Sequence, residues 1–188
     1  MGAIPELRTE RLLPRPFTPA DADAIQAPLS TPDIAATTLN IPYPYPEGAA
    51  LAWTATMREV AEAEHTFRWA ITRNDNGSSL GSITLGVTDR HRRGELGYWL
   101  GIPSWNRGFM SEATRRVITF GFDRLGLHRI ETNGYPRDAA SARVMMTDGM
   151  RYGGTLRGYV RKGDTSEGIA MYAASRSDLD VARSEPTG

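Results

Sequence analysis

Residues 97–113 read GYWLGIPSWNRGFMSEA, and they contain the most informative junction of the chain, from a strand into a helix. The strand covers 95–100, and apolar residues at 113, 117, 120 and 125 recur with the spacing of a helix that Gly126 ends. The first turn of a helix has unpaired backbone N–H groups and the positive end of the helix dipole. The junction is therefore a candidate pyrophosphate site, and spacing alone leaves an ordinary strand-to-helix connection as the alternative.

The segments on either side of the junction predict a mixed α/β domain without an internal repeat. Bulky residues alternate along 66–72 and along 83–87, and the turn sequence NDNG at 74–77 joins the two as a hairpin, with 95–100 as a third antiparallel strand. Pro14 places the first strand at a sheet edge. The other expected elements are a strand at 7–17, helices at 22–29 and 47–65, a weaker helix start at 31–33, a proline-rich loop at 41–46, a strand at 128–135, a helix at 139–147 and two strands around 163–164.

Length and composition indicate one folded domain. The chain has 188 residues, which we assign to a domain at 1–180 and a tail at 181–188. Its 40% hydrophobic content supports a core, and the absence of cysteine excludes disulfides, a thiolate zinc site and a cysteine nucleophile. No run of about 18 apolar residues occurs, and the N-terminus lacks the apolar stretch of a signal peptide. We therefore expect a cytoplasmic protein.

The charge distribution argues against nucleic acid and membrane partners, because the net charge is zero. The two halves differ, however. Residues 1–89 hold six Arg and eleven acidic residues, a net charge of −5, whereas 90–188 hold fifteen Arg, one Lys and eleven acidic residues, a net charge of +5. The second half is therefore suited to an anionic ligand.

Three common motifs are absent or misplaced. The sequence GSSLG at 77–81 has the G-x-S-x-G pattern of serine hydrolases, but it lies in the predicted hairpin and not at a strand-to-helix turn. No two glycines are two positions apart, and the single lysine is followed by glycine, which excludes a dinucleotide fingerprint and a P-loop. The histidines at 65, 91 and 128 lack metal-ligand spacing, so we expect no metal.

Several segments resemble, in the right order, the GNAT N-acyltransferase superfamily, and specifically the branch of the RimJ and RimL ribosomal-protein N-terminal acetyltransferases. The segments 9–17, 93–100, 105–113, 125–131 and 136–149 resemble its first strand, fourth strand, coenzyme A pyrophosphate loop, fifth strand and following helix. The resemblance runs nearly end to end. It implies the GNAT fold, an α/β architecture with a mostly antiparallel, twisted sheet of about seven strands flanked by helices.

Some positions depart from the family pattern. In the pyrophosphate loop, Trp105, Gly108 and Met110 take the positions of Gln or Arg, Gly, and Gly or Ala. Asn106 stands where glycine is common, and it leaves the backbone donors available. Asp138 stands where many members have asparagine; it is a good helix N-cap, but its carboxylate suits a coenzyme less well than an amide does.

The resemblance implies direct transfer of an acetyl group from acetyl coenzyme A to an amine. Glu95 is the expected base, acting through water, and a salt bridge with Arg92 or Arg93 is its alternative role. Ser141 is expected to donate a hydrogen bond to the departing thiolate, and a simple helix-start serine is the alternative. The expected coenzyme-binding residues are Trp99, Leu100, Ile102, Asn106, Arg107, Gly108, Phe109, Met110, Ser111 and Asp138.

The sequence leaves open the acceptor and two alternatives to acetyl transfer. The acceptor is a protein N-terminus or a small amine, and the acidic N-terminal half suits a cationic acceptor. A noncatalytic acyl coenzyme A sensor is one alternative, which Asp138 favours and Glu95 with Ser141 disfavours. An acyltransferase that uses another donor, such as succinyl coenzyme A, is a second one. The protein is expected to be a monomer or a homodimer.

Overall fold

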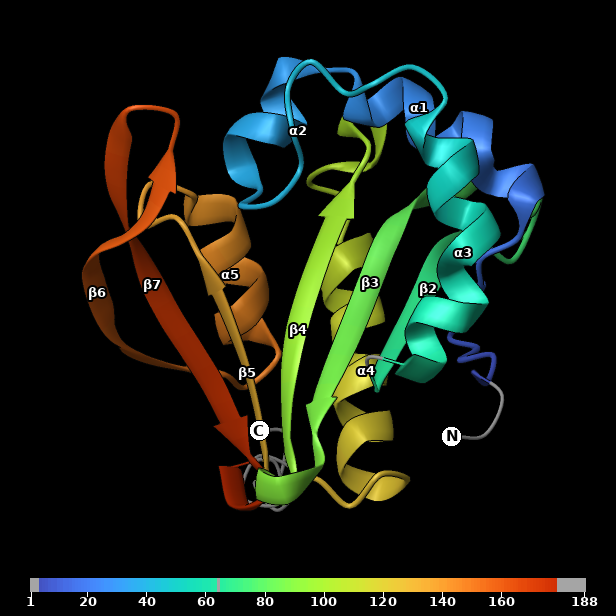
Figure 1. Cartoon of the computed structure of the whole chain (residues 1–188). Coiled ribbons are helices and arrows are strands. Elements are labelled where there is room, and N and C mark those ends of the chain that lie inside the picture. The colour runs from blue at the N-terminus through green and yellow to red at the C-terminus, as the bar shows by residue number, and fades with distance from the viewer. Residues whose placement is uncertain (1–3, 64, 179–188) are drawn as a thin grey trace.

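The computed structural model describes residues 4–63 and 65–178, and the predicted tail at 181–188 lies outside them. The described chain forms one seven-stranded sheet in the order β1-β2-β3-β4-β5-β7-β6 with helices on both faces (Figure 1). The pairing of β4 with β5 is parallel, and the other five pairings of this sheet are antiparallel. The predicted fold class is therefore confirmed.

The elements follow the predicted order. They are β1 (Leu12–Pro16), α1 (Ala22–Leu29), α2 (Pro32–Thr37), α3 (Ala49–Ala63), β2 (Thr66–Arg73), β3 (Ser79–Thr88), β4 (Arg93–Leu100), α4 (Phe109–Asp123), β5 (Arg129–Gly134), α5 (Ala139–Thr147), β6 (Arg151–Lys162) and β7 (Thr165–Ser175), with short 3-10 turns η1 (Pro19–Asp21), η2 (Asp89–His91) and η3 (Ile102–Ser104).

Several boundaries differ from the prediction, among them the starts of the first strand and of α4. The first strand begins at Leu12, because the preceding residues turn back along it: the Leu7 N–H donates to the Pro14 carbonyl at 2.8 Å and the Thr9 N–H to the Leu12 carbonyl at 2.9 Å. Helix α4 begins at Phe109, four residues before its apolar repeat starts. The edge position of β1 and the antiparallel β2–β3–β4 arrangement are confirmed.

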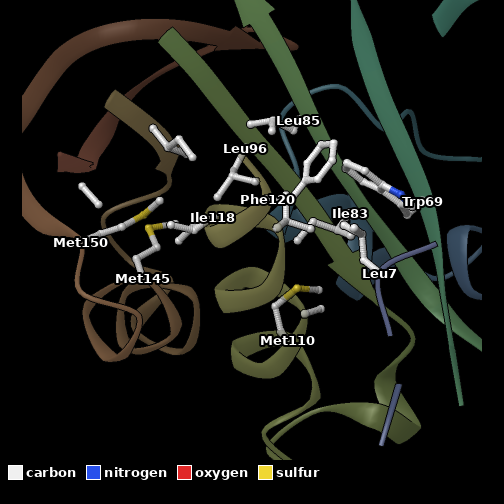
Figure 2. Packing of buried hydrophobic residues seen from close by; sticks show 14 of the residues in the cluster. Leu7, Trp69, Ile83, Leu85, Leu96, Met110, Ile118, Phe120, Met145 and Met150 are labelled. Atoms are coloured by element: carbon white, nitrogen blue, oxygen red, sulfur yellow. The ribbon is translucent and has the colours of Figure 1, made fainter. Parts of the chain in front are cut away.

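The main core lies between the sheet and helices α4 and α5. Alternate residues of β2 and β3, among them Trp69 and Ile83, point toward Phe120 of α4 (Figure 2). The rings of Trp69 and Phe120 meet edge to face, with 5.7 Å between their centroids. At Gly121 a Cβ atom would lie 2.6 Å from the Ile130 side chain, so this glycine allows α4 to approach β5 closely. A smaller core, built on Ala22, Ile25, Leu29, Ile34 and Ala50, holds α1–α3 against the other face.

Strands β4 and β5 separate halfway along their length. They pair from Arg93 opposite Arg129 to Leu96 opposite Thr132, and residues 97–100 of β4 lie beyond this register. The strands diverge toward the end of the sheet that α2 covers (Figure 1). The backbone of β4 therefore has an open edge in the middle of the sheet. Among the described residues, no helix is long and apolar enough to cross a membrane.

Candidate active site

Two cavities meet where β4 and β5 separate. The first, which we call the α4–α5 cavity, has a volume of about 460 Å³ and lies between the end of β4, the start of α4 and α5. The second, the α1–α3 cavity, has a volume of about 500 Å³ and lies between the sheet and the helices of the N-terminal half. Five residues line both cavities: Thr37, Thr38, Tyr98, Trp99 and Ser141. The two cavities are therefore contiguous at the open edge of β4.

The loop before α4 is shaped to hold an anion. Asn106 and Gly108 both have left-handed backbone conformations, with φ values of 56° and 74°, and Gly108 is the N-cap of α4. Asparagine tolerates this region better than most residues, which explains its presence where glycine is common. The Trp105 indole N–H donates to the Leu100 carbonyl at 2.7 Å and ties the loop to the strand. The first backbone N–H groups of α4 have no intrahelical partner, so the loop and helix start suit a pyrophosphate.

Most of the predicted coenzyme residues come together in this cavity. Ile102 and Arg107 are not among its lining residues: Ile102 lies on η3 and is 40% exposed, and the Arg107 guanidinium lies 5.3 Å from the centre of the Phe109 ring. The predicted residues that do line the α4–α5 cavity are Trp99, Leu100, Asn106, Gly108, Phe109, Met110, Ser111 and Asp138.

Asp138 is the N-cap of α5, as its sequence context predicted. Its carboxylate accepts the Ser141 backbone N–H at 2.9 Å. The cap fixes the start of α5 and, with it, the position of the Ser141 side chain. The Asp138 carboxylate, which stands where many family members have asparagine, is thus used to cap α5.

Ser141 forms a pair with Tyr98 that the sequence reasoning missed. The Tyr98 hydroxyl and the Ser141 hydroxyl are 2.9 Å apart, in a position shared by both cavities. Burial raises the pKa of Tyr98 well above its ordinary value, so the phenol keeps its proton. The sequence pattern of β4 could have indicated this position of Tyr98. Residues 96, 98 and 100 lie on one face of the strand, so Tyr98 shares with Leu96 and Leu100 the face that α5 covers.

Glu95 lies in the α1–α3 cavity, which Ser141 also lines. Its carboxylate accepts the Asn133 side-chain N–H at 3.1 Å, another contact that the sequence did not reveal. The structure does not show the alternative role of Glu95, a salt bridge with Arg92 or Arg93. Arg93 instead pairs with Glu131 at 3.1 Å, and Arg92 donates to the Gly126 carbonyl.

Helix α2 covers the junction of the cavities and is held from the opposite half of the chain. The Lys162 ammonium donates to the carbonyls of Ala35 and of Thr38, the latter at 2.9 Å. The Arg137 guanidinium donates to the Ala36 carbonyl at 3.1 Å. We call these contacts the α2 clasp. Because Thr37 and Thr38 line both cavities, the clasp fixes their common wall.

Comparison with known proteins agrees with this geometry. Residues 11–151 match the family model described as an acetyltransferase (GNAT) domain. YoaA of Bacillus subtilis, an uncharacterized N-acetyltransferase, is 30% identical over 171 residues, or 90% of this chain and 96% of the relative. A GNAT-family acetyltransferase from Bacillus anthracis has a TM-score of 0.80 at 23% identity, with 92% of this chain and 99% of the other covered. Mycobacterium smegmatis RimJ, solved with a coenzyme A disulfide, has a TM-score of 0.80 at 20% identity, with 89% and 83% covered.

The split sheet, the loop before α4 and these matches define the class of protein as acyl coenzyme A-dependent N-acetyltransferases. The chain belongs to the family of GNAT acetyltransferase domains. The co-substrate of this family is acetyl coenzyme A, and the left-handed loop and unpaired helix N–H groups of this chain fit its pyrophosphate. Within the described residues, no group of three or more His, Asp or Glu side chains is placed to hold a metal ion.

Proposed function

We propose that this protein transfers the acetyl group of acetyl coenzyme A directly to a primary amine, either a protein N-terminus or a small molecule. The contact between the two cavities at Tyr98, Trp99 and Ser141 carries the proposal. A thioester bound in the α4–α5 cavity and an amine bound in the α1–α3 cavity would come into contact at these residues, through the opening between β4 and β5. Proximity and orientation of two bound reactants are a large part of what such an enzyme supplies.

The coenzyme is assigned to the α4–α5 cavity. The backbone N–H groups of residues 106–111 hold the pyrophosphate at the start of α4, where the helix dipole is favourable. The pantetheine arm follows the open edge of β4 along residues 97–100. A backbone N–H on this edge then polarises the thioester carbonyl and stabilises the oxyanion that forms on it.

The reaction forms a C–N bond and breaks the C–S bond of the thioester. Glu95 takes a proton from the ammonium of the acceptor through a water molecule, and the neutral amine attacks the carbonyl carbon. Asn133 holds the Glu95 carboxylate in place. Ser141 donates a hydrogen bond to the thiolate as it leaves, and the protonated Tyr98 hydroxyl orients Ser141. The nitrogen loses its second proton as the amide forms, and the thiolate takes up one proton, so the products are the amide and free thiol.

Thiol release tests the proposal. The full chain is mixed with acetyl coenzyme A and a panel of N-terminal peptides and small amines, and free thiol is followed by a colorimetric reagent while calorimetry measures coenzyme binding. We expect thiol release that depends on the amine, together with an acetylated product by mass spectrometry. Micromolar coenzyme binding without release on any amine would favour a noncatalytic sensor. Thiol release from succinyl coenzyme A but not from acetyl coenzyme A would show that the acyl donor is a different one. Failure to bind coenzyme A would contradict the assignment of the coenzyme to the α4–α5 cavity.

A further inference from the structure

The α1–α3 cavity has two walls of different chemistry. One wall is apolar and comes from four parts of the chain: α1, the loop that follows α2, α3 and β4. The large residues of this wall are Ile25, Leu29, Ile41, Tyr45, Trp53 and Trp99. The other wall is the polar sheet surface that carries Glu95 and Asn133. A molecule in this cavity therefore has its amine at one side and an apolar environment at the other.

The apolar wall belongs to the smaller core, and some of its large side chains keep part of their surface exposed. Ile41, Tyr45, Trp53 and Trp99 pack against the smaller core but are only partly buried. The Trp53 ring is fixed by an edge-to-face contact with Phe17, with 5.0 Å between the centroids. Burial raises the pKa of Tyr45 above its ordinary value, as expected for a hydroxyl in apolar surroundings. An apolar group in the cavity removes more of these rings from water.

Among the described residues, the polar wall offers one anionic group. Of the described residues that line the cavity, only Glu95 has a carboxylate. One carboxylate suits one amine, whereas the further ammonium groups of a polyamine would meet no second carboxylate among the described lining residues. They would instead lie near the Arg68 guanidinium or against indole and aliphatic side chains, where an unpaired charge is costly. A cavity of about 500 Å³ is also within the usual range for a small-molecule site.

We infer, on the basis of the proposed function, that the preferred acceptor is a monoamine attached to an aromatic or branched aliphatic group. The amine lies beside Glu95 and its apolar group packs against Trp53, Tyr45 and Trp99. A small arylalkylamine and a peptide with an aromatic first residue both present this chemistry, and the experiment separates them.

The test compares rates of thiol release for phenethylamine, ethylamine, spermidine, and the tripeptide amides Phe-Ala-Ala and Ala-Ala-Ala. We expect kcat/KM for phenethylamine to exceed that for ethylamine and for spermidine by about tenfold or more, because part of a ring is buried on binding. A higher value for phenethylamine than for the Phe peptide identifies a small molecule as the source, and the reverse order identifies a peptide.

Variants locate the effect in the apolar wall. Trp53→Ala is expected to lower kcat/KM for phenethylamine about tenfold, whereas kcat/KM for ethylamine should change less than about threefold. Tyr45→Ala removes a smaller side chain and is expected to act in the same direction. Tyr152→Ala is the matched control, because Tyr152 is 55% exposed on β6 and is not among the residues that line the cavity. Equal rates for ethylamine and phenethylamine, or a preference for spermidine, would overturn the inference and leave the proposed function standing. Thiol release with no amine at all would overturn both.

Discussion

At the scale of single residues, the Tyr98–Ser141 pair is the contact that the mechanism depends on most. Ser141→Ala removes the hydroxyl that lies 2.9 Å from the Tyr98 hydroxyl and that we propose as the hydrogen-bond donor to the thiolate. We expect kcat to fall about 100-fold, the lower end of the roughly 10²- to 10⁴-fold that a positioned acid contributes, because Ser141 donates a hydrogen bond to the thiolate. The dissociation constant of acetyl coenzyme A, measured by calorimetry, should change little. Ser78→Ala, in the exposed β2–β3 turn, is the control, and an unchanged kcat in Ser141→Ala would remove this residue from the mechanism.

Asp148 is a buried carboxyl outside both cavities, and it makes the stability of the protein depend on pH. Its side chain has no exposed surface, Oδ2 lacks a hydrogen-bond partner in the described chain, and its ion-pair partner Arg115 lies 3.3 Å from Oδ1. Burial raises the pKa of Asp148 from 3.8 to about 7. The folded protein therefore keeps this proton up to about pH 7 while the unfolded chain releases it near pH 4. As a result, the contribution of this group to the free energy of unfolding declines as the pH rises between these two values.

Asp148→Asn tests this dependence, because the amide keeps the shape of the side chain and cannot ionise. We expect the variant to be more stable than the wild type at pH 8, by about 1–3 kcal/mol, and the difference to shrink or reverse near pH 4. Urea unfolding of both proteins at several pH values measures this difference in the free energy of unfolding. A difference that does not vary with pH would show that Asp148 is ionised in the folded state throughout this range.

At the scale of elements, the α2 clasp links the N-terminal helices to the β6–β7 hairpin. Lys162→Met removes the hydrogen bonds to the carbonyls at the end of α2, which a cation stabilises by about 0.3–1 kcal/mol. We expect the KM values of the amine and of acetyl coenzyme A to rise several-fold with a smaller change in kcat, because Thr37 and Thr38 line both cavities. Lys162→Arg should restore most of the loss. Arg161→Met is the control, since Arg161 is exposed at the hairpin tip, and an equal rise in KM for both methionine variants would contradict the role of the clasp.

The predictions from sequence were most accurate where an element is defined by its own residues. The hairpin turn at 74–77, the strand-to-helix connection before α4 and the N-cap at Asp138 are local patterns, and each is confirmed as an element of structure. Contacts between distant segments were missed. The bond between Tyr98 and Ser141 and the clasp by Lys162 join residues 43 and 124 positions apart, and they depend on how β4 diverges from β5. No short sequence pattern encodes such a divergence.

At the scale of the whole molecule, the proposed function gives the two faces of the sheet separate tasks. Helices α4 and α5 cover the face with the large core and the α4–α5 cavity, and α1–α3 cover the face with the α1–α3 cavity (Figure 1). We propose that the first cavity binds the donor and the second the acceptor. The proposed mechanism assigns to the chain a base, a hydrogen-bond donor to the thiolate and a backbone N–H for the oxyanion, and it assigns no nucleophile that would accept the acetyl group. Direct attack across the opening between β4 and β5 therefore requires both substrates to be bound at the same time.

Two-substrate kinetics test this central claim most directly. Initial rates of thiol release are measured with acetyl coenzyme A varied at several fixed concentrations of an acceptor amine. We predict double-reciprocal lines that intersect, as for a ternary complex, and no burst of thiol when the amine is omitted. Parallel lines, or a stoichiometric burst of thiol without amine, would indicate an acetylated enzyme intermediate and would contradict direct transfer between the two cavities.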